Sequence, residues 1–164
     1  MNDKMPRAEP GATADLPRSL APCEPCAYAR TTRVAATGSP AYSETLPRRA
    51  EAASAARLLV THALAVWHLD ALTDDATLIV TELVANAVNH ARGESIRVAI
   101  AQLADHGALV SVFDASRVDP KLHRVGPDEE RGRGLVMVAA VSERWGTDPL
   151  PWGKRVWARM RVPS

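Results

Sequence analysis

The spacing of apolar residues changes once along this chain, and this change restricts the possible folds more than any other feature. Between Ala53 and Trp67 apolar residues recur every three to four positions, as on one face of a helix. Between Ile96 and Phe113 they recur every second position on both sides of a turn at 105–107, which is typical of a β-hairpin. Both kinds of element bury an apolar side against another element. The pattern therefore predicts helices packed on a largely antiparallel sheet.

Further elements are expected on both sides of this central part. They are a strand over 41–46, a helix over 73–90, an apolar helix over 135–141, and closing strands over 144–147 and 155–162. We expect Thr73 to be the N-cap of the second helix, because two acidic residues follow it, and Gly93 to close that helix. The predicted fold is an α/β two-layer sandwich, with one mixed, mostly antiparallel sheet and three helices on one face.

The first 40 residues are expected to form a disordered tail. Seven of the 12 prolines precede Arg48, and they are mixed with small and charged residues that bury little apolar surface. Cys23 and Cys26 lie in this tail, and one C-x-x-C pair supplies only half of a tetrahedral zinc site. We therefore expect no metal or redox role for the two cysteines and a single domain over 41–163.

The overall charge argues against several classes of partner. The formal net charge of +1 predicts no strong attraction to nucleic acid or to an anionic membrane surface. No apolar run is long enough to span a bilayer, and residues 1–10 lack the apolar core of a signal peptide. We therefore expect a cytoplasmic protein that binds neither nucleic acid nor a membrane.

A carboxylate and an amide share one face of the expected helix over 73–90. Glu82 and Asn86 are four residues apart, which makes them neighbours on a helix. An amide oxygen can ligate Mg²⁺, which prefers oxygen ligands, and a carboxylate can accept a proton from an attacking hydroxyl group. The alternative is a polar stripe exposed to solvent, with no chemical role.

Asp114 ends the second strand of the expected hairpin. In the alternation it shares a face with Val110 and Val112, which should meet the helices. A carboxylate on this face needs a hydrogen-bond donor, because burying it unpaired is costly. The amino group of an adenine base is one candidate donor, and capping of the turn that follows is the alternative.

Glycines introduce the apolar helix expected over 135–141. In the run Arg131-Gly132-Arg133-Gly134 they allow the backbone to approach a phosphate at the start of a helix, and the two arginines could bind it as well. The alternative is a flexible loop end with solvated arginines. The polar stretch over 116–131 is long for a plain connection, and loops of this length are usually lids or binding loops.

Three of these segments together resemble a known family. Thr81–Ala91 resembles the N box of the GHKL, or Bergerat-fold, ATP-binding proteins. Asp114–Pro120 resembles their G1 box, and Gly132–Val138 resembles their G2 box. Trp145-Gly146 and the run over 153–157 are similar to the ends of single-domain members, the anti-sigma-factor serine kinases.

The resemblance implies a role for each candidate residue. Glu82 would be the general base, and Asn86 would hold Mg²⁺ and so help to bind the nucleotide. The other implied roles are adenine binding by Asp114, contacts to the nucleotide by Ser116, Gly132, Gly134 and Leu135, and a contact to the γ-phosphate by Arg131 or Arg133.

The implied function is that of an ATP- and Mg²⁺-dependent serine protein kinase that regulates transcription. Such a kinase phosphorylates an antagonist of an anti-sigma factor, binds a sigma factor, or does both, and it often forms a homodimer. The alternative is a catalytically inactive ATP-binding regulator that sequesters a partner. Two differences from the family pattern motivate it: Ser116 replaces a common glycine, and Lys154-Arg155 stands where many members carry threonine. A histidine kinase is disfavoured, because no histidine precedes Ala41.

Overall fold

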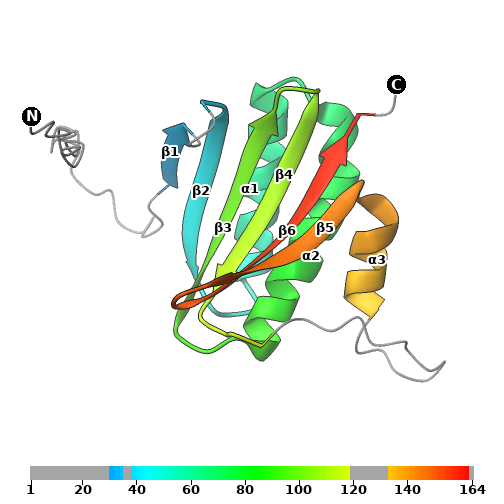
Figure 1. The fold of residues 1–164 in the computed structure, drawn as a ribbon. Helices are drawn as coiled ribbons and strands as arrows, with labels where there is room; N and C mark the ends of the chain where they lie inside the picture. Colours follow the sequence, from blue (N-terminus) through cyan, green and yellow to red (C-terminus); the bar gives the residue numbers. More distant parts are fainter. Residues whose placement is uncertain (1–29, 35–37, 119–132, 163–164) are drawn as a thin grey trace, which may run out of the picture.

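The computed structural model describes residues 30–34, 38–118 and 133–162. Figure 1 shows two layers, with a six-stranded sheet facing the viewer and three helices behind it. The strands are β1 (Arg30–Val34), β2 (Pro40–Pro47), β3 (Ser95–Leu103), β4 (Gly107–Asp114), β5 (Arg144–Leu150) and β6 (Gly153–Arg161). The helices are α1 (Ala52–Val66), α2 (Thr73–His90) and α3 (Arg133–Val141), with a 3₁₀ helix at Asp70–Leu72. The two-layer sandwich predicted from the sequence is confirmed.

The order of strands in the sheet is β1-β2-β3-β4-β6-β5, and every neighbouring pair is antiparallel. The expected parallel component of a mixed sheet is therefore not found among these six strands. Its absence follows from the position of β6. Since β6 pairs antiparallel with both β4 and β5, it separates two strands that run in the same direction and would otherwise have paired parallel.

The core lies between the sheet and the helices, where the apolar face of the sheet packs against the apolar faces of the helices. Val98, Val112 and Val156 lie side by side across β3, β4 and β6, and all three are buried. From the helices, Val60 and Leu64 of α1 are fully buried against this face. Each such aliphatic side chain contributes about 1.5–3 kcal/mol through burial. α2 contributes buried side chains of its own to this core, which hold it against the sheet.

Both ends of α2 differ from the expectation. Thr73 is the first helical residue rather than the N-cap, because the 3₁₀ helix at Asp70–Leu72 runs directly into α2 and gives Thr73 helical backbone angles. At the other end α2 stops at His90, as expected, but its C-cap is Ala91 in extended backbone, and Gly93 with its positive φ lies two residues beyond. Arg48 donates from Nε to the Gly93 carbonyl at 2.6 Å and from Nη1 to the Val88 carbonyl at 2.8 Å. This cation therefore supports the carbonyl end of α2, where a positive charge is favourable.

The segment expected to be disordered contains β1, which pairs with β2 in the register Arg30↔Glu44. Cys23 and Cys26 lie outside the described residues, as does most of the long loop that the sequence pattern marks as a lid. Among the helices that the structure describes, none combines the length and the apolarity needed to cross a bilayer.

A group of ion pairs holds the β3–β4 turn to β6. Asp105 accepts hydrogen bonds from Arg159 and Arg161, and Arg159 Nε also lies 3.0 Å from Glu143 Oε2. The hydrogen bond from Arg161 is the main cause that lowers the pKa of Asp105 below its ordinary value of 3.8. The charged form of Asp105 is thus favoured in the folded protein.

Replacing Asp105 by asparagine is expected to reduce stability at neutral pH but not in acid. A carboxylate whose pKa is lowered by folding stabilises the fold above its unfolded pKa, and this contribution is lost as the pH falls through the folded pKa. Urea unfolding of Asp105→Asn and the unchanged protein should therefore give curves that differ at pH 7 and converge as the pH is lowered below 3.8. A difference that stays constant over this range would show that the charge of Asp105 is not what stabilises the turn.

Candidate functional site

The predicted site residues come from four segments that meet at one end of the sandwich. In Figure 1 these are the end of α2, the end of β4, the start of α3 and the start of β6, all at the lower end of the molecule. Two contacts join them: α3 meets α2 where Gly134 lies against Glu82, and the loop after α2 meets the loop after β4 where Gly93 lies against Ala115. The fold therefore brings residues 82–86, 114–116, 134 and 153–154 to a common region.

Glu82 and Gly134 are in direct contact. A Cβ atom added to Gly134 would lie 2.2 Å from Glu82 Oε2 and 3.2 Å from its Cδ. The carboxylate of Glu82 thus occupies the space that any other residue at position 134 would fill with a side chain. Gly134 lies in the first turn of α3, and the first turn of a helix has backbone N–H groups with no partner inside the helix, which can bind anions. The Glu82 carboxylate therefore lies directly beside the start of α3.

Asn86 lies one turn after Glu82 on α2 and is half-buried. Its Nδ2 atom is buried and has no hydrogen-bond partner among the residues that the structure describes. A half-turn of the amide exchanges nitrogen and oxygen, so this unpartnered position can equally present an oxygen. Mg²⁺ usually binds one or two protein oxygens together with substrate phosphates and water. The Asn86 amide, one helical turn from Glu82, fits such an ion.

Asp114 is buried, as the alternation in β4 predicted, with only 2% of its side chain exposed. Its Oδ1 atom accepts a hydrogen bond from the Ser116 backbone N–H at 2.7 Å and one from Lys154 Nζ at 3.0 Å. The Lys154 side chain is itself only 7% exposed, and it also donates to the Ser116 carbonyl at 3.4 Å. Asp114 therefore both caps the turn that follows it and belongs to a buried ion pair.

The sequence marks Lys154 as a difference from the family pattern but does not predict its contact with Asp114. The two residues face each other in the register of β4 and β6, and both side chains are buried. Extending the alternation of β6 back from Val156 would have placed Lys154 on the helix-facing side. That position was the signal available in the sequence, and a buried lysine on this side requires an acidic partner.

Gly153 allows β6 to start very close to the end of β4. A Cβ atom at this position would lie 1.9 Å from the Asp114 carbonyl oxygen and 2.9 Å from Ala115 Cα. Both neighbours are backbone atoms, so they cannot turn away as a side chain would. The approach brings the following residue, Lys154, within hydrogen-bonding distance of the Asp114 carboxylate.

The remaining predicted site residues belong to α3, to the turn after β4 and to the segment before α3. Arg133 opens α3 and is exposed, and Leu135 packs into the core with 4% exposure. Ser116 is buried, and its Oγ accepts a hydrogen bond from the Val118 N–H at 3.2 Å. Arg131 and Gly132, predicted to contact phosphate, lie outside the described residues.

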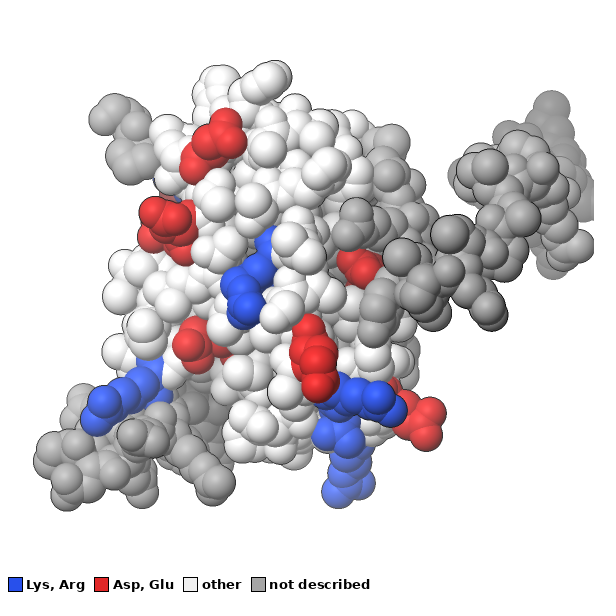
Figure 2. All heavy atoms as spheres, turned by 180° about the vertical axis from the view of Figure 1, so that it is seen from behind, with Lys and Arg blue, Asp and Glu red and all other residues white. Residues whose placement is uncertain are grey.

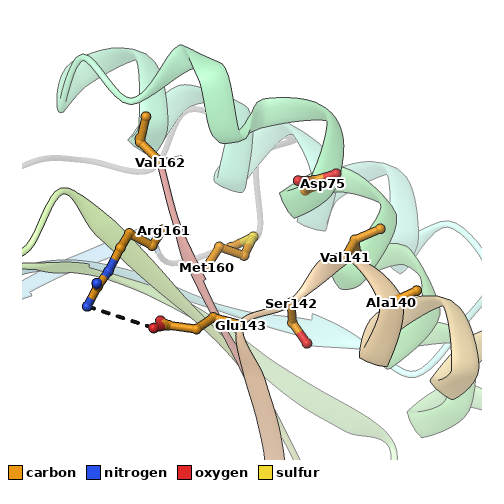
Figure 3. A pocket seen from close by; sticks show the side chains of 8 residues that line it. All are labelled: Asp75, Ala140, Val141, Ser142, Glu143, Met160, Arg161 and Val162. Carbon is orange, nitrogen blue, oxygen red and sulfur yellow. Dashed lines mark ion pairs between the residues drawn. The ribbon is translucent and has the colours of Figure 1, made fainter. Parts of the chain in front are cut away.

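A separate cavity of about 350 Å³ lies at the opposite end of α2 (Figure 3). It is lined by Asp75, by the end of α3 with the residues that follow it, and by the end of β6, and it contains none of the predicted site residues. Figure 2 shows the helix side of the molecule, where blue and red side chains are interspersed in a largely uncharged surface. The candidate site is therefore defined by the contacts around Glu82 and Asp114, not by this cavity.

Most of this chain matches a known protein family. Residues 46–160 match the family model described as a histidine kinase-like ATPase domain, which is well over half of the 164-residue chain. The match includes the candidate residues of α2, β4, α3 and β6. A comparison with curated proteins finds no match to this chain.

Proposed function

Since this chain belongs to the family of histidine kinase-like ATPase domains, which bind ATP, we propose that it is a serine protein kinase of the anti-sigma-factor type. In this proposal it transfers the γ-phosphate of ATP to a serine of an antagonist protein, binds a sigma factor, or does both. The observation that carries the proposal is the contact between the Glu82 carboxylate and Gly134 at the start of α3. It puts a potential general base beside a place suited to the phosphates.

The proposal gives each part of the site a separate task. Glu82 takes the proton from the attacking serine hydroxyl, and the N–H groups at the start of α3 bind the transferred phosphate. Asn86 would hold Mg²⁺, which when bound neutralises part of the charge on the phosphates. Asp114 accepts a hydrogen bond from the base of the nucleotide. Arg131 and Arg133 stay candidates for contact with the γ-phosphate.

The Asn86 assignment predicts how Mg²⁺ affects ATP binding. The unchanged protein should bind ATP more tightly with Mg²⁺ than with a chelator, and Asn86→Ala should lose most of this difference, on the order of tenfold. Calorimetric titration with ATP under both conditions measures it. The control is Asn89→Ala, which alters an exposed asparagine in the last turn of the same helix. An unaltered Mg²⁺ effect in Asn86→Ala would remove Asn86 from the metal site.

The kinase proposal itself is tested by a pull-down with and without ATP, followed by a transfer assay on the captured protein. We expect an ATP-dependent partner that gains phosphate on serine. Tight ATP binding without phosphate transfer to any captured partner would instead favour the second candidate, a regulator that acts by sequestration. The buried Lys154, which already pairs with Asp114, is the observation that favours this second candidate, because it alters the place expected to bind the base.

A further inference from the structure

The carboxylate of Asp114 already has a strongly bound donor before any nucleotide arrives. Lys154 Nζ lies 3.0 Å from Oδ1, and the Ser116 N–H lies 2.7 Å from the same oxygen. With side-chain exposures of 2% for Asp114 and 7% for Lys154, the pair is shielded from water. Hydrogen bonds between charged groups in such surroundings are stronger than those between neutral groups.

A neutral amino group gains less from this carboxylate than from an unpaired one, because the charge of Asp114 is already partly neutralised by Lys154. An adenine 6-amino group would have to share Asp114 with an ammonium ion that binds Oδ1 and neutralises part of the carboxylate charge, so the amino group would use Oδ2. Lysine carries three N–H donors, and the structure assigns two of them, to Asp114 and to the Ser116 carbonyl. The third can donate to an acceptor on the base. A 6-oxo group is such an acceptor, whereas a 6-amino group is not, and adenine offers only its ring nitrogens as acceptors.

We propose that Lys154 determines how this site treats the 6-position of a purine, and that it makes the site accept 6-oxopurine nucleotides nearly as well as ATP. Where Asp114 alone would offer the base only an acceptor, the Asp114–Lys154 pair offers it an acceptor and a donor side by side. ATP can donate its amino group to Asp114, and a 6-oxopurine can donate its N1–H to Asp114 while its oxygen accepts from Lys154. This inference rests on the proposed function, in which Asp114 faces the base.

Inosine triphosphate provides the test, because it differs from ATP only in the 6-oxo group and the proton that accompanies it. Calorimetric titration of the full chain with each nucleotide in the presence of Mg²⁺ should give dissociation constants within about threefold of each other. Lys154→Thr, which puts an uncharged β-branched residue in the strand, should raise the preference for ATP to about tenfold or more. Arg155→Thr is the matched control, because Arg155 faces the other side of β6 and pairs with Asp148.

Each outcome decides between the proposals. A tenfold or larger preference for ATP in the unchanged protein overturns the inference but leaves the proposed function standing. If the ratio of the two dissociation constants is the same in the unchanged protein and in a folded Lys154→Thr, the ion pair is only structural. This result also overturns the inference. Binding of neither nucleotide overturns the inference and the proposed ATP site together. Circular dichroism reports whether the variant folds, and Lys154→Gln replaces it if it does not.

Discussion

Replacing Glu82 by glutamine is expected to slow phosphate transfer about a hundredfold or more while ATP binding stays close to that of the unchanged protein. Glutamine has nearly the same shape, so the contact with Gly134 is retained, but it cannot accept the proton of an attacking hydroxyl. The loss therefore falls on the chemical step. The measurement is transfer from labelled ATP to serine of the captured partner, with ATP affinity measured by calorimetry on the same preparation.

A second variant displaces the same carboxylate without removing it. Gly134→Ala puts a methyl group 2.2 Å from the present position of Glu82 Oε2. Because that atom is the end of a flexible side chain, it can move aside at little cost in stability, and transfer should fall without unfolding. Glu94→Gln alters an exposed carboxylate between α2 and β3 and serves as the control. Transfer at the normal rate by Glu82→Gln would exclude Glu82 as the base.

The elements of the fold were predictable because their signals are local. The helices α1 and α2 and the β3–β4 hairpin follow from apolar spacing within about 15 residues. Glu82 and Asn86 could be placed together for the same reason, since four residues of helix bring two side chains to one face. The details at the start of α2 were not predictable in this way. Threonine is a residue type favoured at N-caps, but the preceding 3₁₀ helix gives Thr73 helical backbone angles.

The contacts that define the site depend on packing between distant segments. Lys154 and Asp114 are 40 residues apart in the chain, and they meet only because β6 pairs with β4 in one particular register. Glu82 and Gly134 come from two helices whose relative position is set by the core. A family resemblance gave the candidates, but it could not predict that a buried lysine occupies the carboxylate expected to bind the base.

Replacing Gly153 by alanine is expected to destabilise the fold by about 3 kcal/mol. The added methyl group would lie 1.9 Å from the Asp114 carbonyl oxygen and 2.9 Å from Ala115 Cα. Relief requires the end of β4 to move away from β6, which strains the pairing of Asp114 with Lys154. For a chain of this size such a loss corresponds to a fall of roughly 6–12 °C in the unfolding midpoint.

Gly134→Ala is the matched comparison for this prediction, because it too adds one methyl group in close contact, but against a mobile carboxylate. Thermal unfolding followed by circular dichroism should therefore show a large shift for Gly153→Ala and a small one for Gly134→Ala. The folded fraction of Gly153→Ala should also resemble Lys154→Thr in its preference for ATP over inosine triphosphate, since the same ion pair is loosened. If Gly153→Ala is as stable as the original protein, β4 and β6 do not need this close approach. The explanation that the approach places Lys154 against Asp114 would then be wrong.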